Sequence, residues 1–108
     1  MSGFDEREDE FEKRFAMDES LRFRALARRS KLVGLWVAGL LGYAGAEADS
    51  YAASLVASQV GAADPDETLF KAVETALSQG GVEMSENRIR RKLAETLAEA
   101  AAQIKAGV

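Results

Sequence analysis

The sequence contains neither cysteine nor histidine, and these two absences exclude much of the chemistry that small proteins perform. Without cysteine the chain has no disulfide and no thiol nucleophile. Without histidine it has no imidazole to bind zinc or to act as a general base. The remaining residues form no glycine-rich phosphate loop, no metal-ligand spacing and no pairing of a nucleophile with a base. The sequence therefore predicts a protein that is not an enzyme, binds no metal and requires no cofactor.

Proline occurs only once, and apolar runs long enough for a membrane are also missing. Alanine, leucine, glutamate and arginine dominate, and strand patterning is absent, so we expect an all-α fold. The most apolar stretch, 32–45, has 14 residues and four glycines, whereas a membrane-spanning helix needs about 20 residues. The chain begins MSGFDEREDE, which lacks the basic start of a secretory signal. We therefore expect a cytoplasmic protein without direct membrane insertion.

The negative charge is concentrated at one end of the chain. Residues 1–20 carry a net charge of −5, while the other 88 residues sum to +1. An overall charge of −4 argues against a nucleic-acid partner, because phosphate binding needs a dominant basic face. This asymmetry divides the chain into an N-terminal arm, 1–20, and a body, 21–108.

Three phenylalanines of the arm, Phe4, Phe11 and Phe15, fall on one line of a helix. Acid-before-base pairs four residues apart contribute only a few tenths of a kcal/mol each, so the arm is predicted to be flexible or marginally helical. In a continuous helix this line would lie about 100° from Phe23, away from the expected core. We therefore predict that the arm offers its rings to a groove of a partner protein. The alternative is that the arm folds back and docks its rings on the body. The predicted partner-binding residues are Phe4, Arg7, Glu10, Phe11, Arg14 and Phe15.

The segment 21–42 is predicted to be the central helix, because its second half is apolar nearly all round. Its expected core stripe is Phe23, Leu26, Ala27, Ser30, Gly34, Val37 and Leu41, with Val33 and Leu40 at the edge. Basic residues beside the first half of this stripe are expected to form a solvated surface: Arg22, Arg24, Arg28, Arg29 and Lys31. Gly45 is available as a left-handed cap after this helix.

Three further helices follow from start and stop signals. One spans 47–59 and ends at Gly61, the next opens at Asp64-Pro65 and stops at Gly80-Gly81, and the last is capped by Ser85. The connections are short, so the expected fold is a four-helix bundle. The expected core residues of these helices are Ala48, Tyr51, Ala52 and Leu55, then Leu69, Phe70, Val73, Ala76 and Leu77, then Ile89, Leu93, Leu97, Ala100 and Ile104.

Two basic clusters are candidate anion sites. Arg88, Arg90, Arg91 and Lys92 crowd the first turns of the last helix, where a phosphate or the phosphates of a nucleotide would bind well. The alternative is that these cations pair with Glu83, Glu86, Glu95 or other surface acids. The basic set around residues 28–31 lies near Trp36, which either contacts a purine nucleotide or is plain core. The candidate nucleotide-binding residues are Arg28, Arg29, Lys31, Trp36, Arg88 and Arg91.

Four stretches of the chain carry a family resemblance. The arm FDEREDEFEKRFAMD and the segment ARRSKLVGLWVAGLLG, followed by DPDETLFKAV and ENRIRRKLAE, resemble the zeta subunit of the bacterial F-type ATP synthase, a regulatory family found in alphaproteobacteria. This resemblance implies a four-helix bundle whose N-terminal arm inserts into the catalytic sector, between catalytic subunits and rotor, and blocks ATP hydrolysis. It places the inhibitory segment at about Ser2 to Glu19. It also implies that the bundle binds ADP or ATP as a regulatory ligand, and that the protein is peripherally associated with the membrane-bound synthase.

Two other functions remain open on the sequence. One is a nucleotide-sensing adaptor bundle whose arm binds another protein, and the other is a small structural subunit without a switch. The arm favours the inhibitor, because an adaptor would more naturally use a face of its bundle.

Overall fold

The computed structural model describes residues 18–108, and within this range the chain forms four α-helices and no strand. They are α2 (Glu19–Leu40), α3 (Gly45–Gln59), α4 (Pro65–Gln79) and α5 (Glu86–Lys105). The predicted all-α, four-helix fold is therefore confirmed. None of the helices in this part of the chain is long and apolar enough to cross a membrane.

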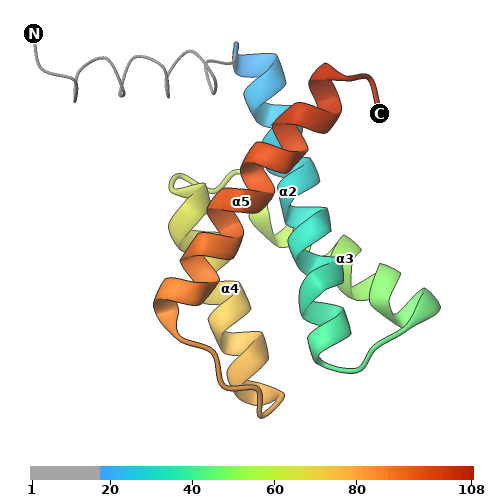
Figure 1. The fold of residues 1–108 in the computed structure, drawn as a ribbon, viewed down its shortest axis with the longest axis vertical. Helices are drawn as coiled ribbons and strands as arrows, with labels where there is room; N and C mark the ends of the chain where they lie inside the picture. The colour runs from blue at the N-terminus through green and yellow to red at the C-terminus, as the bar shows by residue number, and fades with distance from the viewer. Residues whose placement is uncertain (1–17) are drawn as a thin grey trace, which may run out of the picture.

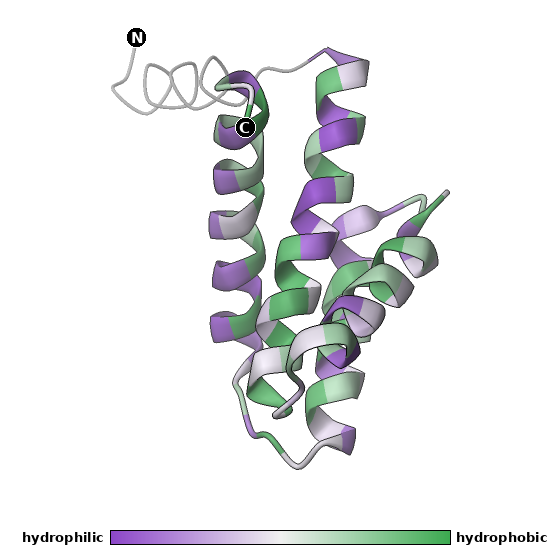
Figure 2. Ribbon diagram, turned by 90° about the vertical axis from the view of Figure 1, so that its right-hand side faces the viewer, coloured by the Kyte–Doolittle hydropathy of each residue, from purple (hydrophilic) through white to green (hydrophobic). Residues whose placement is uncertain are grey.

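The two longest helices, α2 and α5, run antiparallel and side by side (Figure 1). With 22 and 20 residues they are longer than α3 and α4, which have 15 residues each. As a result, the N-terminal turns of α2 and the C-terminal turns of α5 extend together from one end of the bundle (Figure 1). The apolar faces of the helices turn towards one another, while polar residues lie on their outer sides (Figure 2).

Three helices begin with a side-chain cap. Asp18 accepts a hydrogen bond from the backbone N–H of Leu21, Asp64 from that of Glu67, and Ser85 from that of Arg88. Each cap satisfies a backbone donor that the first turn of a helix leaves without a partner. The predicted starts at Asp64 and Ser85 are therefore confirmed. Asp18 has an extended backbone, so α2 does not continue as a helix through this position.

Gly42, not Gly45, provides the left-handed residue that ends α2. Its φ is +84°, and the Tyr43 N–H bonds to the carbonyl of Ala38, which completes a Schellman motif. The prediction of Gly45 as this cap was wrong because α2 ends at Leu40, one turn earlier than a cap at Gly45 requires. Gly45 itself begins α3.

The core forms where all four helices meet. Its buried apolar residues are Val33 and Val37 from α2, Leu55 from α3, Leu69, Phe70, Val73 and Leu77 from α4, and Ile89 and Leu93 from α5. Most of the expected stripe residues of α4 and α5 are buried, as predicted, whereas in α3 only Ala52 and Leu55 are buried and Ala48 and Tyr51 are half-buried. In α5, however, Leu97 and Ile104 are only half-buried, while Thr96 and Ala101 are buried.

The first half of α2 departs from its expected stripe. Phe23 is 70% exposed and Ala27 is also exposed, whereas Ala25 is fully buried. At the other end, Leu40 is 38% exposed. The predicted set of buried residues is wrong for the first half of α2. Because α2 is longer than its neighbours α3 and α4, its first turns lie mainly against α5 (Figure 1).

Candidate functional site

The predicted partner-binding residues, Phe4 to Phe15, lie outside the described residues, so their contacts stay a prediction. The described residues do include the point at which the arm joins the bundle. The N-cap at Asp18 sets the first residue of α2 at Glu19. The arm therefore joins the bundle at the end where α2 and α5 extend together (Figure 1).

Arg29 is buried, with 2% of its surface exposed, and this corrects the prediction that it belongs to a solvated basic surface. Its Nη1 donates a 2.7 Å hydrogen bond to Oδ1 of Asp66, in the first turn of α4. Asp66 itself is well exposed. The prediction failed because the two residues are 37 positions apart, and only the packing of α4 on α2 brings them together.

Arg90 is held by two acids and one aromatic ring. It donates hydrogen bonds to Glu86, one turn earlier on α5, and to Glu67 on α4. Its guanidinium carbon lies 3.9 Å from the centre of the Phe70 ring, a cation–π distance. The hydrogen bonds to Glu86 and Glu67 hold the pKa of Arg90 above its ordinary value. For this member of the α5 cluster, the alternative of pairing with acids is the one observed.

Arg88 and Arg91 remain exposed and form no ion pair with any described residue. Their chain neighbours are differently placed, because Arg90 is paired and Lys92 lies 5.5 Å from the centre of the Trp36 ring. Trp36 is half-buried and packs against the core. These contacts leave Arg88 and Arg91 as the two guanidinium groups of the α5 cluster that are free for a ligand.

The two candidate nucleotide clusters lie at different places along the bundle. Arg28 donates hydrogen bonds to Gln103 and to the carbonyl oxygen of Val108, near the last turn of α5. Arg88 lies at the opposite end of α5. It is 15 residues from Gln103, the partner of Arg28, and this separation corresponds to about 22 Å along a helix. Arg28 and Arg88 are therefore not brought together into one site.

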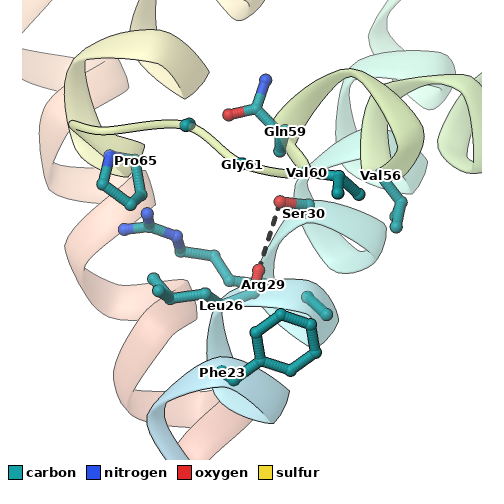
Figure 3. Close-up of a pocket in the computed structure, with 11 residues that line it drawn as sticks. Phe23, Leu26, Arg29, Ser30, Val56, Gln59, Val60, Gly61 and Pro65 are labelled. Carbon is teal, nitrogen blue, oxygen red and sulfur yellow. Dashed lines mark hydrogen bonds between the residues drawn. The ribbon is translucent and has the colours of Figure 1, made fainter. Parts of the chain in front are cut away.

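A cavity of about 250 Å³ lies between α2, α3 and the connection from α3 to α4 (Figure 3). Its walls are mainly apolar and include Phe23, Leu26, Val56, Val60 and Pro65. Three polar residues also line it: Arg29, Ser30 and Gln59. The Ser30 hydroxyl donates to the carbonyl of Leu26, as the dashed line in Figure 3 shows. The sequence signals had assigned Phe23 and Leu26 to the core, so this cavity was not predicted.

Two residues that line the cavity each carry one polar atom that is buried without a hydrogen-bond partner among the described residues. These atoms are Nε of Arg29 and Oε1 of Gln59. A second, more open cleft adjoins the cavity and shares Phe23, Ala27 and Val56 with it. That cleft is lined by the cations Arg24, Arg28 and Lys31. Two members of the first candidate cluster thus surround a common cleft, while Trp36 lies elsewhere, against α5.

No group of acidic side chains able to hold a metal ion occurs between residues 18 and 108. A search of curated proteins found no match to the chain. The family model for the ATPase inhibitor subunit zeta, however, matches residues 1–103. This match includes the arm, the central helix α2 and nearly all of α5. The chain therefore belongs to the ATPase inhibitor subunit zeta family.

Proposed function

We propose that the protein inhibits ATP hydrolysis by the F-type ATP synthase, and that it does so by inserting its arm, about Ser2 to Glu19, into the catalytic sector. The observation that carries this proposal is the family match, which spans both the arm and the bundle. The arm supplies the aromatic anchors Phe4, Phe11 and Phe15, and the charged residues Arg7, Glu10 and Arg14 contact the walls of the groove. The protein would act as a regulator bound peripherally to the synthase, with no catalytic residue of its own.

Inhibition of this kind requires only that the arm binds one conformation of a catalytic interface in preference to the others. The catalytic interfaces of a rotary ATPase change shape during each cycle, and a segment that binds one of these shapes preferentially opposes the next change. A preference of about 5.5 kcal/mol is enough to shift a two-state equilibrium from 1:99 to 99:1. The rings of three phenylalanines offer burial on this scale, because each fully buried large apolar side chain contributes about 1.5–3 kcal/mol.

In this proposal the bundle is a structural unit separate from the arm that it carries. The core described above draws its members from α2, α3, α4 and α5, and Asp18, the N-cap residue directly before α2, has an extended backbone. We therefore place the boundary between the inhibitory arm and the bundle close to residue 20, with the bundle over 21–108.

A chain shortened to residues 21–108 tests this division. We expect the intact protein to inhibit ATP hydrolysis by the soluble catalytic sector in a saturable manner, and the shortened chain to lose this inhibition. Circular dichroism should show that the shortened chain is still folded. Inhibition by the shortened chain would contradict insertion of the arm. No inhibition by the intact protein would favour the adaptor, a bundle that binds some other protein.

We further propose that ADP or ATP binds the bundle as a regulatory ligand. Two clusters are available: the cleft of Arg24, Arg28 and Lys31, and the exposed pair Arg88 and Arg91 at the capped start of α5. Arg29 and Trp36, the other two candidates, are engaged by Asp66 and Lys92, respectively. This engagement makes them supports of a cluster more than direct phosphate ligands.

An NMR titration distinguishes the two clusters. We expect millimolar ADP to shift backbone amides at one cluster and to leave those at the other unchanged, because Gln103, which Arg28 contacts, lies about 22 Å along α5 from Arg88. The variants Arg28→Gln and Arg88→Gln serve as a matched pair, and only the one in the binding cluster should weaken the shifts. Unchanged amides at both clusters would exclude the nucleotide proposal and leave the inhibitory role intact.

A further inference from the structure

A groove lined mainly by apolar side chains runs along the first half of α2. The cavity and the open cleft described above adjoin one another, and both are lined by Phe23, Ala27 and Val56. Phe23 and Val60 remain 70% and 75% exposed, so no segment between residues 18 and 108 covers them. Exposed apolar side chains that lie together mark interaction sites. The groove is therefore a surface on which apolar side chains of another segment can dock.

The two sides of the groove carry opposite charges. One side, which we call the basic rim, is lined by Arg24, Arg28 and Lys31. The other side is formed by the connection from α3 to α4, which leads into Asp64 and Asp66. Both aspartates are exposed, although one oxygen of Asp66 already accepts a hydrogen bond from Arg29. We call this side the acidic rim, and a segment that fits the groove must carry the opposite charge on each of its own flanks.

The arm is the segment of this chain that lies nearest to the groove in the sequence. Its residues 1–17 lie outside the described residues, and the chain enters α2 at the N-cap Asp18. Phe23, where the groove begins, is about 7.5 Å further along the helix. The arm can therefore reach the groove by folding back over the first turns of α2.

The spacing of the arm's rings matches the length of the groove. The groove extends along α2 from Phe23 to Ser30, which is about 10 Å of helix. Phe11 and Phe15 are one turn apart, about 6 Å on a helical arm, so both rings fit into the groove. Phe4 would lie about 10 Å beyond Phe11, outside the groove.

A helical arm would carry acids and bases on opposite flanks of these two rings. A rotation of about 100° per residue places Glu8 and Glu12 at about +60° and +100° from Phe11. The same rotation places Arg7 and Arg14 at about −40° and −60°. One flank of the arm is therefore acidic beside the rings, and the other flank contains the two arginines.

The direction in which the arm must run brings each flank to the rim of opposite charge. On α2, the three cations of the basic rim lie at about +80° to +140° from Phe23, and Leu26, on the side of the acidic rim, lies at about −60°. Two antiparallel helices that face one another bring residues of the same rotation sense to the same side. An arm attached to the start of α2 can fold back along it only in the antiparallel direction. The acids of the arm then meet the basic rim, and its arginines meet the acidic rim.

We propose that in the free protein the arm docks in this groove as a helix antiparallel to α2, with Phe11 and Phe15 against Phe23 and Val56. Burial of the two rings and the cost of ordering the segment are of similar size, so about half of the chains are docked at equilibrium. A docked arm is not available to a partner, so docking weakens inhibition by about twofold. This effect on inhibition rests on the proposed function, whereas the docking itself does not.

A spin label on the arm of the full chain tests the docking. The chain has no cysteine, so Asp9→Cys provides a single attachment point, about 160° from Phe11 and hence outside the contact. We expect the label to broaden the amide signals of residues 56–61. Adding Phe11→Ala and Phe15→Ala should remove at least about two thirds of this broadening, whereas adding Phe4→Ala should preserve it. Equal broadening in these two variants would overturn the proposal. Broadening that disappears on dilution would also overturn it, because the arm of a second copy would then be the occupant.

Charge substitutions in the labelled chain test the antiparallel register. Glu8→Lys places a cation against the basic rim and should reduce the broadening at least about twofold, and Lys31→Glu added to it should restore the broadening. Glu10→Lys makes the same change of charge on the opposite flank, about −100° from Phe11, and should not reduce the broadening. Equal losses in Glu8→Lys and Glu10→Lys would contradict the register.

The docking and the proposed inhibitory role fail on different measurements. Broadening that does not depend on the rings, together with inhibition of ATP hydrolysis by the intact protein, would reject the docking alone. Broadening that depends on the rings, without inhibition by the intact protein, would reject insertion into the catalytic sector and leave the docking in place.

Discussion

The double substitution Phe11→Ala, Phe15→Ala should weaken inhibition of ATP hydrolysis by at least about a hundredfold in the concentration needed for half-inhibition. Truncating a buried aromatic anchor costs about 2 kcal/mol or more at an interface, and two such losses correspond to a factor of several hundred. The measurement is ATP hydrolysis by the cognate soluble catalytic sector with increasing amounts of each protein. Thermal unfolding of the variant should match that of the unmodified chain, because the bundle core draws on α2 to α5.

A control substitution on the bundle distinguishes the loss of the proposed anchors in the arm from the loss of any exposed phenylalanine. Phe23 is 70% exposed and belongs to α2, outside the proposed inhibitory segment. Phe23→Ala should therefore leave inhibition unchanged within about twofold. If the double variant inhibits as well as the unmodified chain, the rings of the arm are not the anchors, and insertion through them is wrong.

Gly34→Val should destabilise the bundle by about 3 kcal/mol or more, and Gly34→Ala by about 1–3 kcal/mol. A Cβ atom added at Gly34 would lie 2.8 Å from Cα of Ala52 and 3.1 Å from its Cβ. The backbone of Ala52 cannot make room for this Cβ atom unless α3 moves away from α2. Chemical denaturation monitored by circular dichroism measures the loss, and 1 kcal/mol lowers the melting temperature by about 4–8 °C in a domain of this size.

Gly39 provides the matched control on the same helix. A Cβ added there meets no atom within 4 Å, and its φ is not in the left-handed region. Gly39→Ala should stabilise the protein by up to about 1 kcal/mol, because alanine is the better helix former. If Gly34→Ala stabilised the protein as Gly39→Ala does, α2 and α3 would not approach as closely as described.

The starts of α4 and α5 and the inner core were predictable because their signals are local. Asp64 and Ser85 are capping residues followed by apolar periodicity, and the structure places both as N-caps. The stripe containing Leu69, Val73 and Leu77 needs only the helical repeat, and these residues are buried.

The cavity and the buried cation were not predictable, because they depend on where helices end relative to one another. A helical pattern assigns Phe23 to a face but does not say that α3 and α4 leave this face without cover. Arg29 resembles its basic neighbours in the sequence, and only the packing of α4 against α2 gives it Asp66 as a partner. Pairings between helices follow from crossing geometry, which periodicity does not encode.

The unequal helix lengths have a mechanical consequence if the arm stops a rotating shaft. Force applied to the arm enters the bundle at Asp18 and passes along α2, which at 22 residues is about 33 Å long. The first turns of α2 are braced mainly by α5, through contacts such as Arg28 with Gln103. A sideways force on the arm would therefore bend the protruding ends of α2 and α5 before it disturbs the core. The end of the bundle nearest the arm would deform elastically, and the core would stay packed.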